Sequence, residues 1–79
     1  MMQLREDIIK ALQKKFEGEI SAHKINVEIM LENTVGIGEH SGVVETVEKE
    51  LDIIAEYEDK LSVLKKYFVG AKKKEVLNG

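Results

Sequence analysis

The chain has 79 residues with no cysteine and no proline, which excludes disulfides and thiolate metal sites and leaves nothing to interrupt long helices. It is 43% hydrophobic and 34% charged, with a formal net charge of −3. No apolar run reaches the roughly 18 residues of a membrane span, and the amino terminus lacks the apolar segment of a secretory signal. We therefore expect one small domain that is neither transmembrane nor secreted. A domain of this size, without disulfides or metals, commonly gains stability by oligomerisation.

The first predicted helix spans about residues 3–32. Apolar side chains recur there in steps of three and four, a helical spacing, with a histidine in the same row. The row comprises Leu4, Ile8, Leu12, Phe16, Ile20, His23, Val27 and Met30, and it is widened by Ile9, Ile25, Ile29 and Leu31. Gly18 lies inside the segment and costs about 1 kcal/mol relative to alanine. It indicates a kink, a close approach of another helix, or a local weak point.

Residues 33–41 are predicted to form a turn. Asn33 tolerates the left-handed conformation that ends many helices. Gly36 and Gly38 supply backbone freedom. Ser41 is expected to cap the next helix, because its hydroxyl accepts from free amides of the first turn.

The second predicted helix spans about residues 42–69. Its apolar row follows the heptad rhythm. The row comprises Val43, Val47, Glu50 or Leu51, Ile54, Tyr57, Leu61, Leu64 and Phe68. Gly70 is expected to end the helix, and residues 71–79 are predicted to be a flexible basic tail.

The predicted fold is all-α, an antiparallel two-helix hairpin over residues 1–70. A pair of helices has one interface, so broad apolar rows stay partly exposed to solvent. A second copy of the chain is the simplest partner that would bury them. Residues 25–56 carry one basic and eight acidic side chains, whereas residues 57–79 carry six basic and three acidic ones. An antiparallel pair of hairpins would place basic open ends beside acidic turns. We therefore expect a four-helix bundle dimer.

Two segments carry a resemblance to a known group. Asn33–Gly42 has the sequence NTVGIGEHSG, and Asp59–Phe68 has the sequence DKLSVLKKYF. They resemble small uncharacterised proteins encoded by T4-like tailed phages of marine cyanobacteria, with similarity over about residues 4–68. The resemblance implies a setting in the cytoplasm of the infected host or in the virion, and it implies no activity.

The sequence offers weak signals for chemistry. The glycines at 36, 38 and 42 precede a helix, but no strand comes before them and no Gly-Lys-Ser/Thr follows, so a turn is preferred to a phosphate loop. Glu39, His40 and Glu45 are too few and too mobile a ligand set for a transition metal. No glutamate has a histidine three residues later, as the usual di-iron bundles require. We expect no catalytic residue, no cofactor and no bound metal, hence a protein that is not an enzyme.

The sequence therefore predicts a binding or structural module acting through protein contacts, with a second copy and an unidentified host or phage protein as partners. The candidate interaction surface comprises Val35, Ile37, Glu39, His40, Tyr57, Tyr67 and Phe68. His23 is expected to hydrogen-bond across the helix interface, and an assembly made pH-sensitive by a buried imidazole is the less favoured alternative. The alternative is nucleic-acid binding by a basic patch. This patch comprises Lys10, Lys14, Lys15, Lys65, Lys66, Lys72, Lys73 and Lys74. The acidic net charge and the few aromatic side chains make that alternative the less favoured.

Overall fold

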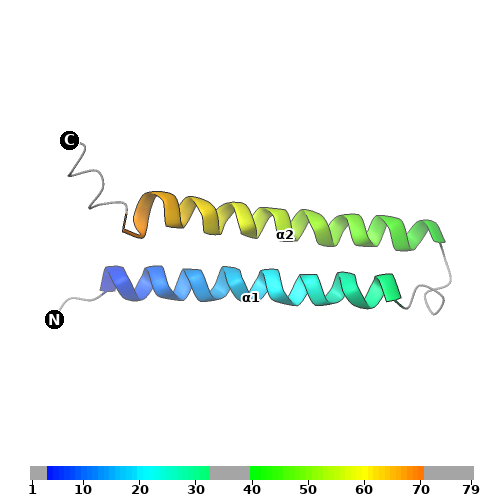
Figure 1. Ribbon diagram of the computed structural model, residues 1–79, viewed down its shortest axis with the longest axis horizontal. Helices are drawn as coiled ribbons and strands as arrows, with labels where there is room; N and C mark the ends of the chain where they lie inside the picture. Colours follow the sequence, from blue (N-terminus) through cyan, green and yellow to red (C-terminus); the bar gives the residue numbers. More distant parts are fainter. Residues whose placement is uncertain (1–3, 33–39, 71–79) are drawn as a thin grey trace.

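The computed structural model describes residues 4–32 and 40–70, apart from the side chains of residues 40 and 41. Helix α1 spans Leu4–Glu32 and helix α2 spans His40–Phe68. The two helices lie side by side and run in opposite directions, so the described ends Leu4 and Gly70 lie at one end of the molecule (Figure 1). The predicted all-α hairpin is confirmed. The expected features of residues 33–39 and 71–79 lie outside the described residues.

The helix ends differ slightly from those expected. Helix α2 begins at His40, two residues before the predicted start, so Ser41 lies within its first turn instead of capping it from outside. No proline stands in this stretch to block the extra residues. At the other end, Gly70 has φ +74°, a left-handed value that favours glycine after a helix. Arg5 of α1 donates from Nη2 to the Phe68 carbonyl oxygen at 3.2 Å, which satisfies one terminal carbonyl of α2 from the facing helix.

The contact between the helices follows the middle of the predicted rows. Phe16 of α1 packs on Tyr57 of α2 with ring centroids 5.8 Å apart. Among the described residues only Val43 and Leu64 are buried, at 9% and 8% exposure. The remaining contact residues are half-buried, so the core is a thin seam between two helices.

The predicted row of α1 is wrong at its amino-terminal end. Leu4 is exposed, and Ile8 is half exposed and reaches α2 only at the open-end groove that it lines with Leu64 and Phe68. Each step of four residues turns about 400°, so a run of such steps drifts about 40° per step around the helix. By Leu4 and Ile8 this drift has carried the row off the contact line. On α2 the alternative between Glu50 and Leu51 resolves toward Glu50, which faces α1, while Leu51 is 50% exposed.

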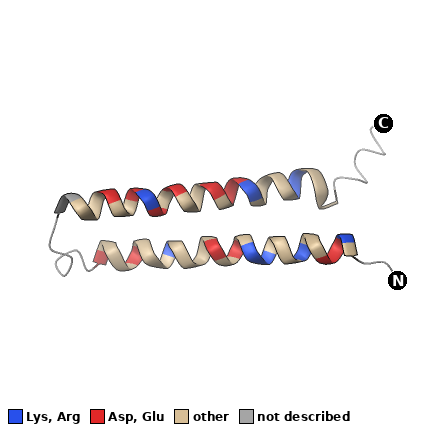
Figure 2. Ribbon diagram, turned by 180° about the vertical axis from the view of Figure 1, so that it is seen from behind, with Lys and Arg blue, Asp and Glu red and all other residues tan. Residues whose placement is uncertain are grey.

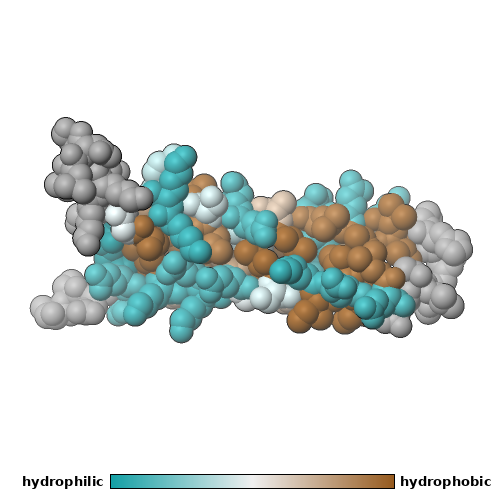
Figure 3. All heavy atoms as spheres, in the orientation of Figure 1, coloured by the Kyte–Doolittle hydropathy of each residue, from teal (hydrophilic) through white to brown (hydrophobic). Residues whose placement is uncertain are grey.

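Much apolar surface stays outside the seam. In the described part of the chain, eleven large apolar side chains are between 39% and 68% exposed. Figure 3 shows apolar side chains covering both helices toward the end where Glu32 and His40 lie. No helix in residues 4–32 or 40–70 is long and apolar enough to cross a membrane.

Candidate interaction surfaces

A polar cluster interrupts the apolar seam near its middle. Nδ1 of the His23 ring donates to Oε1 of Glu50 at 2.5 Å, and Asn26 donates from Nδ2 to the same oxygen at 3.2 Å. The other ring nitrogen of His23 lies 3.4 Å from Oε1 of Glu19. The side chains of His23 and Glu50 are only 21% and 15% exposed. The hydrogen bond expected of His23 across the helix interface is therefore made with α2.

This cluster favours a charged histidine. The hydrogen bond to Glu50 raises the pKa of His23 above its usual 6.5, and the Glu19 carboxylate adds to the effect. The same hydrogen bond lowers the pKa of Glu50 below its usual 4.5, with help from Asn26. Both ring nitrogens face carboxylates, and only the imidazolium can donate from both. An imidazolium held in this way is a poor general base, and its bond to Glu50 ties the two helices together.

One apolar groove lies near the ends at which Glu32 and His40 stand. It is open, with a volume of about 350 Å³, and almost all of its lining is aliphatic. The lining residues are Leu31, Val43, Val44, Val47 and Leu51, with Glu48 at the edge. We call it the turn-end groove.

A second apolar groove lies near the opposite end. It has a volume of about 300 Å³ and is lined by Ile8, Ile9, Leu12, Leu64 and Phe68, with Arg5 at the edge. We call it the open-end groove. Neither groove brings polar side chains together in the way that orients a small ligand, so both suit packing against another protein surface.

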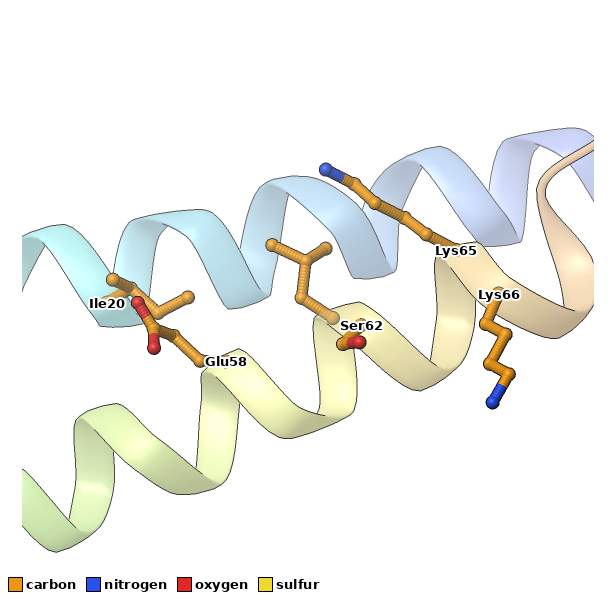
Figure 4. Close-up of a pocket in the computed structure, with 6 residues that line it drawn as sticks. Ile20, Glu58, Ser62, Lys65 and Lys66 are labelled. Atoms are coloured by element: carbon orange, nitrogen blue, oxygen red, sulfur yellow. The ribbon is translucent and has the colours of Figure 1, made fainter.

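A third depression, with a volume of about 690 Å³, has a mixed lining. Ile20 and Leu61 form its apolar part, and Glu58, Ser62, Lys65 and Lys66 form its polar part. In Figure 4 the side chains of Lys65 and Lys66 extend in different directions. The two ammonium groups therefore do not converge on one anion, and this depression is a shallow part of the surface.

The structure separates the residues of the predicted interaction surface. Tyr57 is half-buried against Phe16, so it serves the hairpin's own seam. Tyr67 and Phe68 are exposed and contact each other edge to face at 6.3 Å, close to the open-end groove. Val35, Ile37, Glu39 and the side chain of His40 lie outside the described residues.

The described part of the predicted basic patch is exposed but mixed with acids. Lys10, Lys14, Lys15, Lys65 and Lys66 all lie in the half of the molecule that holds Leu4 and Phe68. Figure 2 shows acidic residues between the basic ones on both helices. Lys15 lies 4.0 Å from Glu19, and the Lys66 ammonium sits over the Tyr67 ring. Lys72, Lys73 and Lys74 lie outside the described residues.

One further surface was not predicted as a separate feature. The side of α1 turned away from the seam carries a row that we call the outer row. It consists of Leu4, Ile8, Ala11, Lys15, Gly18, Ala22, Ile25 and Ile29. All eight are exposed. The signal that would have revealed it is a regular alternation of four- and three-residue steps, hidden in the sequence by the more prominent inner row.

In residues 4–32 and 40–70, no group of three or more histidine, aspartate or glutamate side chains is placed to hold a metal ion. Comparisons with protein-family models, with curated proteins and with solved structures found no match to this chain.

Proposed function

We propose that this protein is a non-enzymatic interaction module that works as a dimer of hairpins, a four-helix bundle whose outward surfaces contact other proteins. Its setting, the infected host cell or the virion, rests on the resemblance of its sequence to phage proteins and belongs to the same proposal. The observation that carries the proposal is the imbalance between two buried apolar side chains and eleven exposed large ones in the described residues.

The imbalance has a direct energetic meaning. Burying apolar surface contributes roughly 25 cal/mol per Å². A two-helix seam leaves the single hairpin only marginally stable against the conformational entropy lost on ordering the chain, which is about 1–2 kcal/mol per residue for the backbone alone. A second copy covers apolar surface on both molecules at once and adds to the stability of the hairpin.

The charges favour an antiparallel dimer. Residues 4–17 and 55–70, the open half, carry seven basic and six acidic side chains. Residues 19–32 and 42–54, the turn half, carry two basic and seven acidic ones. A parallel dimer brings two strongly acidic halves together, whereas an antiparallel dimer brings each acidic half beside a nearly balanced one. Like-charge repulsion between exposed groups is weakened by salt but is not removed within a Debye length of about 8–10 Å.

The test is the molar mass in solution by light scattering, at low and at high salt. We expect about twice the chain mass of 8.9 kDa in both conditions, because apolar burial is insensitive to screening. A monomer over the accessible concentration range contradicts the proposal. A dimer that is lost only at high salt shows that charge, and not the apolar surface, drives association.

Nucleic-acid binding is the second candidate, supported by the exposure of Lys10, Lys65 and Lys66 in the same half of the molecule. Its test is fluorescence anisotropy with labelled duplex and single-stranded oligonucleotides at several salt concentrations. Binding through this patch predicts an affinity that falls steeply with salt and weakens in a Lys65→Gln, Lys66→Gln variant. A Lys24→Gln, Lys49→Gln variant is the matched control, because it removes the same number of charges from exposed lysines in the acidic turn half.

A further inference from the structure

We infer that the two copies pair through the outer row of α1, with the two α1 helices antiparallel and their symmetry axis near Gly18. This inference rests on the proposed dimer and names the surface that forms it. The turn-end groove then lies away from this contact and stays available to other proteins, whereas the open-end groove shares Ile8 with the contact.

The spacing of the outer row is that of a helix-pairing surface. Its members follow one another in steps of four, three, four, three, four, three and four. Such an average of 3.5 residues keeps a row in contact with a second helix along its whole length. The inner row, with its repeated steps of four, drifts away from α2 at its amino-terminal end. The outer row is thus the more regular pairing surface of α1.

The outer row is open in the single hairpin. Leu4, Ile8, Ile25 and Ile29 are between 50% and 58% exposed. These four alone account for more than a third of the exposed large apolar side chains in the described residues. A regular apolar row of this length on one helix is more than the scattered exposure that soluble proteins show.

Gly18 has no explanation within the hairpin. A Cβ atom built at residue 18 meets no other atom within 4 Å, so alanine would fit there and would favour the helix by about 1 kcal/mol. Helix α1 runs without interruption through this residue. A glycine in that position permits the close approach of a second helix. Ala11 and Ala22 in the same row add small side chains on either side of it.

The row is self-complementary about this point. Gly18 is the middle residue of Leu4–Glu32, with small side chains around it and large aliphatic ones toward both ends. A twofold axis at Gly18 places Ala11 of one copy opposite Ile25 of the other, and Ile8 within one residue of the level of Ile29. Large residues then meet small ones near the axis, which is the matching that an isologous interface requires. Lys15, which is 58% exposed, can extend its ammonium group past the contact into water.

The charges along α1 agree with the same direction. Residues 4–17 carry four basic and three acidic side chains, and residues 19–32 carry one basic and three acidic ones. The antiparallel arrangement brings each acidic half of α1 beside the basic half of the second copy. The parallel arrangement brings the two acidic halves together.

The first test compares two variants, Ile25→Gln and Leu51→Gln, by sedimentation equilibrium and circular dichroism. Both side chains are exposed to a similar degree, and both changes preserve net charge and helix propensity. We expect Ile25→Gln to raise the dimer dissociation constant about 100-fold, because each dimer loses two buried isoleucines, with helicity unchanged. We expect Leu51→Gln, in the turn-end groove, to dimerise as the natural chain does.

The outcomes separate the inference from the proposal beneath it. A natural chain that is monomeric overturns the proposed function and the inference together. A dimer that is weakened by Leu51→Gln and not by Ile25→Gln leaves the proposed function standing and overturns the inference in favour of the turn-end groove. A dimer that neither change weakens also overturns the inference.

The second test fixes the direction of pairing with single cysteines, since the chain has none of its own. Gly18→Cys lies at the axis and is expected to form a disulfide between the copies under mild oxidation. Ile29→Cys is expected not to, because eleven residues from the axis at 1.5 Å each separate the two copies of residue 29 by about 33 Å. Cross-linking at residue 29 and not at 18 overturns the antiparallel arrangement. Loss of the dimer in reduced Gly18→Cys, with helicity kept, places residue 18 in the interface and supports the inference.

Discussion

Replacing Leu64 by alanine tests the seam on which the hairpin depends. Leu64 is 8% exposed, the least exposed of the described apolar residues, and it lies beside Ile8, Ile9 and Leu12 in the open-end groove. The change removes three carbons, worth about 0.8 kcal/mol each when buried. Because this groove is open to solvent, water fills the space and little is added for an empty cavity. We therefore expect a loss of about 2 kcal/mol in the free energy of unfolding.

The measurement is thermal unfolding followed by circular dichroism at several protein concentrations, since dimerisation makes the midpoint depend on concentration. For a chain of this size, 2 kcal/mol lowers Tm by about 8–16 °C. Val63→Ala is the matched control, because Val63 is the neighbouring residue on the exposed side of α2, at 43% exposure. Its loss of apolar contact is offset by the better helix propensity of alanine, and we expect a change within about 0.5 kcal/mol. Equal losses of unfolding free energy in the two variants would show that Leu64 does not face α1 more than Val63 does.

Three further results are expected. Stability should be greatest between pH 4.5 and 6.5. Because the pKa of His23 is raised in the fold, its stabilisation is complete below pH 6.5 and is lost as the pH rises. Because the pKa of Glu50 is lowered in the fold, its stabilisation is complete above pH 4.5 and is lost as the pH falls. Melts of a Glu50→Gln variant should show a flatter profile, and an unchanged profile would contradict the cluster. Ile54→Asp should abolish most of the helical signal, because it puts a carboxylate in the half-buried seam; retained ellipticity and mass would show that residue 54 faces water. Gly18→Ala, made in the Ile25→Gln background and measured at a concentration below the dimer dissociation constant of that variant, should raise the free energy of unfolding by up to about 1 kcal/mol. A loss there would mean that residue 18 meets its own hairpin.

The periodicity of the sequence was sufficient to predict both helices, because rows of apolar side chains and the absence of proline leave few alternatives. The start of α1 was placed within one residue and that of α2 within two. Glycine after the last turn marked the end of α2, and Gly70 has the positive φ that this residue type permits. These features are local, and local patterns determine them.

The sequence predicted the middle of the seam and did not predict every side chain that reaches the facing helix. Glu50 and Leu51 are neighbours on α2, and hydrophobicity alone favours leucine as the seam residue. Glutamate occupies the seam because His23 and Asn26 on α1 satisfy the same carboxylate oxygen, a fact that needs both helices in place. For the same reason Leu4 and Ile8 were assigned to the wrong side of α1, since a small angular drift accumulates over successive turns and only the packed partner reveals it.

The paired bonds to Glu50 also restrict how the hairpin can misfold. Two antiparallel helices with mostly aliphatic contacts can slide past each other by one turn, about 5.4 Å, at little loss of apolar burial. Such a slip here would take Glu50 out of its shared contact with His23 and Asn26 and would break at least one of the two bonds to its half-buried carboxylate, which costs more than a mispacked leucine. The slipped alternatives are thus raised in energy without any change to the native contacts. In this way a hairpin with so thin a seam can fold to one alignment of its two helices, instead of to several alignments of nearly equal free energy.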